Sequence, residues 1–272
     1  MPNIAFVHSV NVLGGAERMS EAIIAGLQDK GYHFSLISPE PGALSETFAK
    51  YGAKNYFCPL FQPAIKHPIL TWQHQRRCTE LLTSAKIDVL HTGDLLCVRS
   101  FSRAASNGNI PLVCHVHFPV EAPFVAWVFN KMPAPAAFVF CSQELQNSSG
   151  PILAKYCPNT AQYVFHNGVN IDYFAPAPEF GQTTDMASLK HIGIVANLQF
   201  RKGHDDFIQM AKEVLKTHQN VHFDVIGGDI LQEPREGILR QQIADLGIEQ
   251  HFTFHGQLAD VRDAIRKLDI YV

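Results

Sequence analysis

The 272-residue sequence predicts an α/β protein with two parallel-sheet domains. Three observations support this fold class. Short apolar runs alternate with stretches of helical period, the runs are almost continuously apolar, and one segment rich in proline and small polar residues interrupts the alternation. Continuously apolar strands are typical of parallel sheets that are covered on both faces. The interruption indicates a linker between two α/β units.

The strands are expected at the apolar runs. In the first unit these are Ile4–His8, Phe34–Ser38, Val89–His91, Leu112–Val116, Ala137–Cys141 and Tyr163–Phe165. In the second unit they are Ile192–Ala196, His222–Ile226, Phe252–Phe254 and Ile270–Val272.

Helices are expected between the strands, where apolar residues recur at helical spacing. In Gly15–Lys30 the stripe consists of Met19, Ile23 and Leu27. In His204–His218 it consists of Phe207, Ile208, Ala211, Val214 and Leu215. A third helix, Pro119–Met132, carries Phe124 and Trp127, and burial against neighbouring elements is the favoured interpretation. The alternative is a surface that binds a ligand or faces a membrane.

The domain boundaries follow from the interrupting segment, Ala175–Ser188. Residues 1–178 are predicted to form the N-terminal domain, 179–187 the linker, and 188–272 the second domain. The second domain contains fewer strands than a doubly wound sheet needs, and the sequence ends within a strand pattern. We therefore expect that domain to be incomplete and the chain to be truncated.

Composition argues against several classes of protein. A net charge of -3 provides no general attraction to nucleic acid. No apolar run is long enough to span a bilayer, and no signal peptide is recognisable. The six cysteines contain no C-x-x-C pair, so a zinc knuckle is not indicated and a reducing, cytoplasmic compartment suits them. The stretch "HQRRC", His74–Cys78, is interpreted as a solvated helix face.

Two adjacent glycines, Gly14 and Gly15, separate the first strand from the first helix. They permit two interpretations: a tight turn with positive φ, or backbone N–H groups that bind an anion at a helix N-terminus. Glu17 follows in the first helical turn, where an acidic residue favours the helix.

A second anion site is indicated after the strand Ile192–Ala196. Arg201, Lys202 and Gly203 precede the helix that starts near His204. A lysine beside a helix N-terminus, at the carboxyl end of a strand, suits a diphosphate. The alternative is a pair of solvated loop charges.

His115 and His117 project to one face at the carboxyl end of a predicted strand, where open α/β sheets bind ligands. A metal pair is one interpretation, but no Asp, Glu or Cys lies at a supporting spacing. A histidine that is hydrogen-bonded to the backbone is the other.

Taken together, the motifs resemble the retaining glycosyltransferases of glycosyltransferase family 4, which have the GT-B fold of two Rossmann-like domains. "GGAER" resembles the first-strand loop of that family, "HNGVNIDYF" its hinge signature and "KGHDDFI" its donor loop. "FDVIGG" resembles the strand that leads to a glycine pair, and "FTFHGQLADVRDAIRKLDIYV" the run that follows. The resemblance covers nearly the whole chain in the expected order.

The resemblance implies a role for each motif. His117 is the expected catalytic residue, His115 and Glu17 belong to the acceptor side, and Asn167 and Gly168 form the hinge. The implied donor-binding residues are Gly14, Gly15, Asn197, Arg201, Lys202, Gly227 and Gly228. Asn197 stands where the family usually has an arginine, so its contact to a phosphate carries no charge. The family's pair of C-terminal glutamates would lie beyond Val272.

The implied activity is transfer of a sugar, with retention, from a nucleotide-sugar donor to a glycan or lipid-linked acceptor. Cell-surface polysaccharide or glycolipid biosynthesis is the expected process. No D-x-D triplet occurs, so neither a metal nor another cofactor is expected. A cytoplasmic location is expected, and peripheral contact with the inner face of the membrane is compatible with it. The alternatives are a truncated, non-catalytic remnant that binds only acceptor and a GT-B-fold sugar-nucleotide epimerase.

Overall fold

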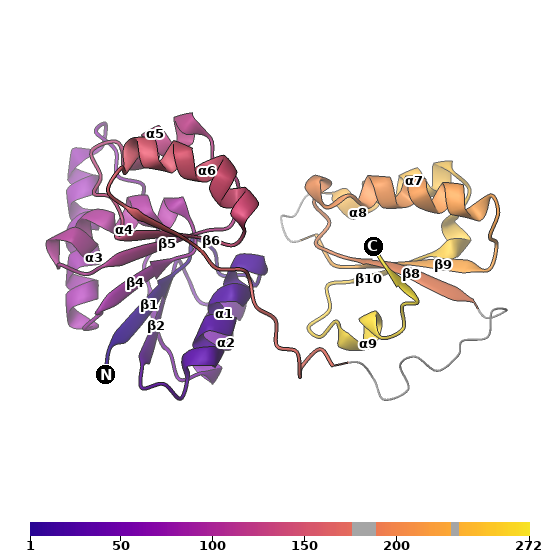
Figure 1. The fold of residues 1–272 in the computed structure, drawn as a ribbon, viewed down its shortest axis with the longest axis horizontal. Coiled ribbons are helices and arrows are strands. Elements are labelled where there is room, and N and C mark those ends of the chain that lie inside the picture. The colour runs from indigo at the N-terminus through magenta and orange to yellow at the C-terminus, as the bar shows by residue number, and fades with distance from the viewer. Residues whose placement is uncertain (176–188, 230–233) are drawn as a thin grey trace. The chain divides into compact units, whose positions relative to one another are not determined.

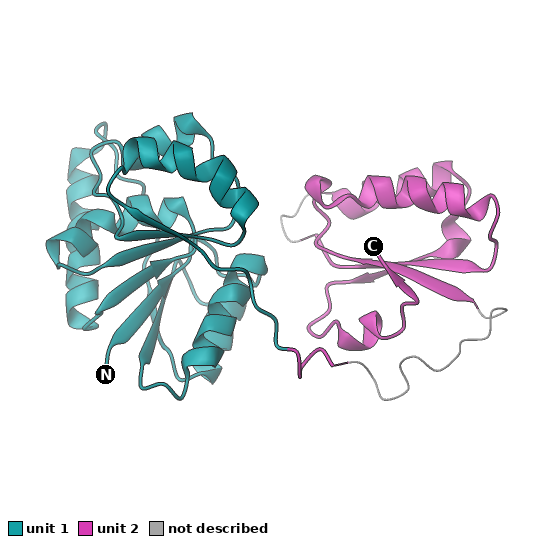
Figure 2. Cartoon of the chain, in the orientation of Figure 1, with its two compact units in different colours: residues 1–170 teal, residues 171–272 magenta. Residues whose placement is uncertain are grey.

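The computed structural model describes residues 1–175, 189–229 and 234–272. The chain forms two compact units, residues 1–170 (unit 1) and residues 171–272 (unit 2), shown separately coloured in Figure 2. The α/β class with parallel sheets is confirmed in both units. The predicted linker, 179–187, lies outside the described residues, and the domain ranges 1–178 and 188–272 stay predictions.

Unit 1 contains a parallel sheet of seven strands in the order β3-β2-β1-β4-β5-β6-β7 (Figure 1). The strands are β1 (Asn3–Val7), β2 (His33–Ser38), β3 (Lys54–Phe57), β4 (Val89–Thr92), β5 (Leu112–Val116), β6 (Ala137–Phe140) and β7 (Ala161–Val164). The helices are α1 (Gly15–Leu27), α2 (Ala43–Lys50), α3 (Pro68–Ser84), α4 (Leu95–Asn107), α5 (Ala122–Phe129) and α6 (Gln143–Tyr156).

Helices cover both faces of this sheet, as its apolar strands require. Successive side chains of a strand point to opposite faces, so Phe6 packs with Ile24 of α1 and Phe48 of α2. Its neighbours Ala5 and Val7 instead join the core that includes residues of α3, α4, α5 and α6. Burial on both faces explains why β1 reads as a continuous apolar run rather than an alternating one.

Several predicted elements shift by a few residues, and one strand was missed. β3 has the sequence Lys-Asn-Tyr-Phe and lies at the edge of the sheet, where a strand needs fewer apolar residues. The predicted stripe of α1 is confirmed in part: Ile23 and Leu27 pack against the core. The buried residues of this helix are Glu17, Ser20 and Ile24. The helix predicted at Pro119–Met132 is limited to α5, with Val125, Val128 and Phe129 buried.

Unit 2 contains a parallel sheet with the strand order β10-β9-β8-β11 within the described residues. The strands are β8 (Lys190–Val195), β9 (Val221–Ile226), β10 (Phe252–Gly256) and β11 (Ile270–Tyr271). The helices are α7 (His204–Leu215), α8 (Arg235–Asp245) and α9 (Arg262–Ile265), with 3-10 turns at Phe200–Lys202 and Glu249–His251. In Figure 1, α7 and α8 lie on one face of the sheet and α9 on the other.

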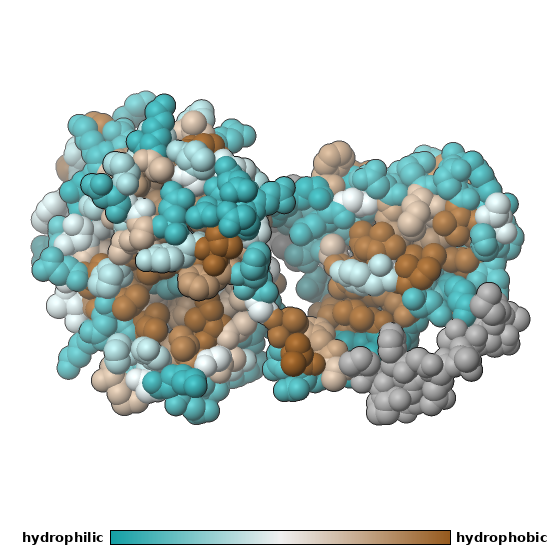
Figure 3. All heavy atoms as spheres, in the orientation of Figure 1, coloured by the Kyte–Doolittle hydropathy of each residue, from teal (hydrophilic) through white to brown (hydrophobic). Residues whose placement is uncertain are grey.

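The core of unit 2 lies under α7 and α8. It contains four of the five stripe residues predicted for α7, which are Phe207, Ile208, Ala211 and Leu215, and Val214 packs against it. Hydrophobic residues are also visible around β11 in Figure 3. There Ile270, Tyr271 and Val272 have exposed fractions of 53%, 61% and 50%.

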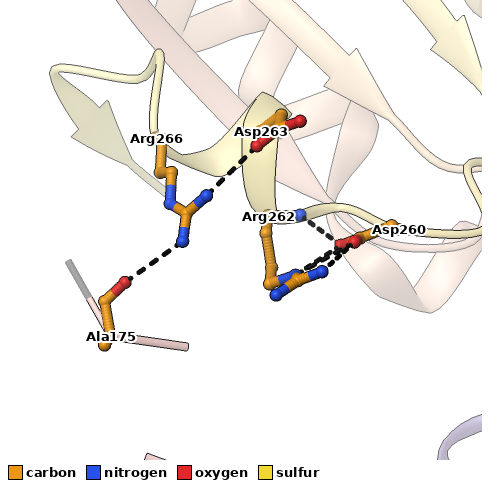
Figure 4. Close-up of polar contacts among 5 residues, drawn as sticks. All are labelled: Ala175, Asp260, Arg262, Asp263 and Arg266. Carbon is orange, nitrogen blue, oxygen red and sulfur yellow. Dashed lines mark hydrogen bonds and ion pairs between the residues drawn. The ribbon is translucent and has the colours of Figure 1, made fainter. Parts of the chain in front are cut away.

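The short helix α9 holds the residues that precede the undescribed segment 176–188. The Arg262 guanidinium lies 3.9 Å from the ring centre of Tyr173 and pairs with Asp260. Arg266 pairs with Asp263 at 3.2 Å and donates a hydrogen bond to the carbonyl of Ala175 at 3.5 Å (Figure 4). These contacts lie within unit 2.

Candidate functional site

Four histidines gather near the carboxyl edge of the unit 1 sheet, and we call them the histidine cluster: His8, His91, His115 and His117. His8 directly follows β1, His91 lies in β4, and His115 lies in β5 with His117 just beyond it. β1, β4 and β5 are neighbours in the sheet, so their ends bring these rings together. The ring centres of His91 and His115 are 5.5 Å apart, and those of His115 and His117 are 4.1 Å apart.

The prediction that His115 and His117 share one face is confirmed by the 4.1 Å separation of their rings. His115 has an exposed fraction of 4%, and burial lowers its pKa to about 4. Burial, with smaller contributions from His115 and His8, also lowers the pKa of His117 to about 4. Both rings are therefore neutral at pH 7. Both nitrogens of His115 and Nε2 of His117 have no hydrogen-bond partner among the described residues.

His8 is held by α1. Its Nδ1 lies 3.2 Å from a carboxylate oxygen of Glu17, and its Nε2 lies 3.0 Å from the hydroxyl of Ser20. With Glu17 ionised, Nδ1–H donates to the carboxylate and Nε2 accepts from Ser20. The ring also requires Gly93, because a Cβ at that position would lie 2.8 Å from it.

Glu17, predicted on the acceptor side, is a buried residue whose two oxygens are both engaged. One accepts from His8 and the other from the backbone N–H of Gly14, at 3.0 Å. Burial alone raises the pKa of Glu17, but its hydrogen bonds and its electrostatic interaction with His8 lower that pKa below its ordinary value overall. Glu17 therefore joins α1 to the end of β1.

The glycine pair does not form the turn with positive φ that the sequence suggested. Gly14 is the N-cap of α1 with φ -98, and its N–H is already bound to Glu17. Gly15 is the first helical residue, and a Cβ built on it would meet no atom within 4 Å. Open space therefore surrounds Gly15 but not Gly14.

In unit 2, the predicted donor loop lies between β8 and α7. Arg201 and Lys202 end the 3-10 turn, and both side chains are exposed. Gly203 follows with φ 77 and serves as the N-cap of α7. Asp205, in the first turn of α7, pairs with Arg235, so its carboxylate is neutralised locally. An exposed lysine thus lies beside a helix N-terminus at the carboxyl end of a parallel strand.

Gly227 and Gly228 lie where β9 ends against the neighbouring strand ends. Gly227 has φ 143, and a Cβ there would lie 2.0 Å from the carbonyl oxygen of Ala196. The N–H groups of both glycines donate within the unit, to the Gly256 carbonyl at 3.0 Å and the Gln257 side chain at 3.1 Å. Asn197, half-buried, lies in the facing segment after β8.

The predicted hinge residues Asn167 and Gly168 are exposed and precede the boundary between the two units.

Sequence reasoning missed His8 and His91 of the histidine cluster. Each ends or nearly ends an apolar run, and comparing the ends of adjacent runs would have grouped them with His115.

Sequence reasoning also missed Asp224 of β9, whose carboxylate lies 2.7 Å from both His191 of β8 and His255 of β10. Only strand pairing reveals that contact.

The interpretation of "HQRRC" as a solvated helix face is wrong for three of its five residues. His74, Gln75 and Cys78 have exposed fractions of 7%, 8% and 0%, whereas Arg76 and Arg77 are exposed. Residues four apart on a helix share a face, and the face that carries His74 and Cys78 is the buried one.

Comparison with known proteins identifies two family models. Residues 13–173 match the model described as Glycosyltransferase Family 4. Residues 185–272 match the model described as Glycosyl transferases group 1. No curated protein matches this sequence.

Solved structures share the fold. HepE from Anabaena, in complex with UDP and glucose, has a TM-score of 0.76 at 17% identity, covering 98% of this chain and 73% of HepE. A glycosyltransferase from Rickettsia africae has a TM-score of 0.75 at 17% identity, with coverages of 99% and 72%. The lipopolysaccharide outer core galactosyltransferase WaaB has a TM-score of 0.63 at 16% identity, with coverages of 99% and 73%.

Proposed function

Because the chain belongs to Glycosyltransferase Family 4, we propose that it moves a sugar from a nucleotide-sugar donor to a glycan or lipid-linked acceptor, with retention and without a catalytic metal. The glycosyltransferase activity follows from the family. The observation that carries the proposal is the match of both halves of the chain to glycosyltransferase models, in the order that a two-domain GT-B enzyme requires. HepE, which shares the fold, was solved with UDP and with UDP-glucose.

Unit 2 is proposed to bind the donor diphosphate. The departing nucleoside diphosphate gains negative charge in the transition state, and fixed positive groups stabilise it without reorganisation. Lys202, with Arg201 and the N-terminus of α7, supplies such groups, and Asn197 adds an uncharged hydrogen bond. Gly203 adopts the left-handed conformation of the loop, and Gly227 leaves room for the Ala196 carbonyl; Gly228 follows it.

Unit 1 is proposed to act on the sugar and the acceptor. His117 is the proposed catalytic residue that contacts the transferred sugar, because its ring is neutral and its Nε2 has no partner among the described residues. His115 supports the ring of His117, and Glu17 acts indirectly by orienting His8. Gly14 and Gly15 allow close approach of a ligand to the start of α1, and Asn167 and Gly168 are the proposed hinge.

A lipid-linked acceptor is supported by a pocket of about 970 Å³ beside α3, α4 and α5. Trp72 and Trp127 provide apolar surface in its lining, and Lys66 and Lys131 provide positive charge. Apolar walls with cations suit an acceptor that combines a hydrocarbon chain with a phosphate. No helix within the described ranges is long and apolar enough to cross a membrane.

The test is calorimetric titration of the purified chain with UDP, GDP and ADP, in the presence of a chelator. Lys202→Ala should weaken binding of the preferred nucleotide roughly 10- to 100-fold, as expected for loss of a charged hydrogen bond. Lys212→Ala, at an exposed lysine within α7, is the matched control and should bind normally. Equal binding by the Lys202 variant, or binding that requires a divalent metal, would move the phosphate site elsewhere.

A second measurement separates transfer from epimerisation. Incubation of the radiolabelled nucleotide sugar without acceptor should leave the sugar unchanged, whereas a sugar-nucleotide epimerase would convert it to its stereoisomer. Conversion without acceptor would contradict the proposed reaction.

A further inference from the structure

Three buried side chains of unit 1 that the proposed reaction does not use lie together: Cys58, His74 and Cys78. Their sulfur and nitrogen atoms all lie within 4.8 Å of one another. The exposed fractions of the three residues are 1%, 7% and 0%. We call this group the thiol–imidazole cluster.

Ordered elements bring the three side chains together. His74 and Cys78 are four residues apart on α3, so they project from the same face in adjacent turns. Cys58 directly follows β3, and its backbone N–H donates to the Ser38 carbonyl at 2.9 Å, which continues the strand pairing. The cluster therefore joins the end of an edge strand to the buried face of a helix.

The ring of His74 is oriented by a neighbour on α4. Its Nε2 lies 2.8 Å from the hydroxyl and 3.3 Å from the carbonyl of Ser100. Histidines that ligate metals usually donate their second N–H to such an oxygen, which fixes the ring and leaves the other nitrogen for the metal. With Nε2–H directed at Ser100, the lone pair of Nδ1 is the one available.

The distances suit a tetrahedral ion. The Cys78 sulfur lies 3.9 Å from Nδ1 and 3.4 Å from Nε2 of His74. Zinc bonds of about 2.3 Å to sulfur and about 2.05 Å to nitrogen at a tetrahedral angle separate the two ligand atoms by about 3.6 Å. A small rotation of either side chain reaches that separation.

We propose that Cys58, His74 and Cys78 bind a zinc ion that links the segment after β3 to α3. Two thiolates balance the charge of Zn²⁺, so the buried complex is neutral, whereas copper(I) would leave a buried negative charge. A water molecule takes the fourth position. The role is structural, separate from the proposed diphosphate site in unit 2, and it does not depend on the proposed function.

Metal content and cobalt spectroscopy test the assignment. The full chain, kept reduced, is incubated with Zn²⁺ or Co²⁺, dialysed and analysed by mass spectrometry for bound metal. About one ion per chain should remain, and the cobalt form should show the sulfur-to-metal charge-transfer band of thiolate ligation. Cys58→Ser and Cys78→Ser should lose both signals. Cys141→Ser and Cys157→Ser, which alter cysteines outside the cluster, should keep both.

A second variant tests the orienting contact. Ser100→Ala should weaken zinc binding roughly 10- to 100-fold in competition with a chromogenic chelator, as loss of an outer partner of a ligand usually does. The cobalt band should persist at saturation, because the three ligands remain.

Several outcomes would overturn the proposal. One is a reduced chain that retains no zinc after dialysis, and another is a cobalt spectrum without thiolate ligation. The spectrum decides even where a serine variant does not fold, since it uses the unaltered chain. A Cys58–Cys78 disulfide in protein purified under reducing conditions would also overturn the assignment.

Discussion

At the residue scale, a few hydrogen bonds position the side chains at the carboxyl edge of unit 1. Glu17 caps the N-terminus of α1 through Gly14 and orients His8 with its other oxygen. A buried carboxylate with both oxygens engaged resists substitution, because each partner would be left without an acceptor. Glu17 therefore stabilises the edge on which the histidine cluster lies.

Glu17→Gln should lower the free energy of unfolding by about 1–3 kcal/mol at pH 7, because a charged, buried acceptor is lost. Its pKa is lower in the folded chain, so the stabilisation is present above the unfolded value and is lost as the pH falls through the folded value. Urea unfolding at pH 7 measures the effect. Glu40→Gln, at an exposed loop carboxylate, should change stability by less than about 0.5 kcal/mol. Equal effects of the two substitutions would contradict the role assigned to Glu17.

Two glycines should respond oppositely to a methyl group. Gly227→Ala should destabilise the chain by about 2–4 kcal/mol, because φ is 143 and the new Cβ would lie 2.0 Å from the Ala196 carbonyl. Gly15→Ala should be neutral or stabilising by up to about 1 kcal/mol, because it adds a helix former in open space. Thermal unfolding measures both. A stable Gly15→Ala chain with weakened ligand binding would support close approach of a ligand there, and a destabilised one would contradict the open space.

At the element scale, pairing of parallel strands gathers polar side chains that are distant in sequence. In unit 1 the neighbouring strands β1, β4 and β5 bring the histidine cluster together. In unit 2 the adjacent strands β8, β9 and β10 place Asp224 between His191 and His255. These residues lie on the face opposite Phe223 and Val225, which pack in the core under α7 and α8. Asp224 thus links three strands across one face.

Asp224→Asn should destabilise unit 2 by about 1–3 kcal/mol, because a nine-tenths buried carboxylate loses its charge between two histidines. Burial raises the pKa of Asp224, but the hydrogen bonds from His255 and His191 lower that pKa overall. Its contribution is therefore present at neutral pH and is lost only in acid. Chemical denaturation measures the change. Asp245→Asn, at an exposed residue at the end of α8, is the control; if it costs as much, the cross-strand link is unimportant.

At the scale of the whole molecule, the chain forms two units with separate cores. Unit 1 contains two apolar clusters, one on each face of its sheet, and unit 2 contains its own under α7 and α8. The stability of each unit can therefore change with pH or denaturant separately from that of the other. The neutral histidines buried in unit 1 make that unit sensitive to acid.

The stability of unit 1 should fall as the pH drops from 6.5 toward 4. His115 has a pKa of about 4 when folded against an ordinary value of 6.5, so in this range the unfolded chain binds protons that the folded chain does not. At pH 5 the loss should be about 2 kcal/mol for this residue relative to pH 8. Urea unfolding at the two pH values, followed by a probe in unit 1, measures it. His115→Gln should flatten the dependence, whereas His166→Gln, at an exposed histidine, should not. An unchanged slope in the His115 variant would contradict the buried neutral ring.

Local sequence was sufficient for much of the fold. Apolar runs predict ten of the strands to within a few residues, because buried parallel strands need continuous apolar side chains. β3 was not predicted, because an edge strand does not need a continuous run of apolar side chains. For the site, the sequence indicated the neighbourhood of His115 and His117 and the loop with Arg201, Lys202 and Gly203, since both motifs are contiguous in the chain.

By itself the sequence thus determined the fold class, the family resemblance and the local motifs, all of which depend on short-range pattern. Tertiary structure alone decided which distant residues meet: His8 with Glu17, His91 with His115, Asp224 with two histidines, and Cys58 with His74 and Cys78. It also decided that Gly14 has negative φ and that "HQRRC" has a buried face. The physical reason is that strand order and helix packing bring these groups together, and no local spacing encodes either one.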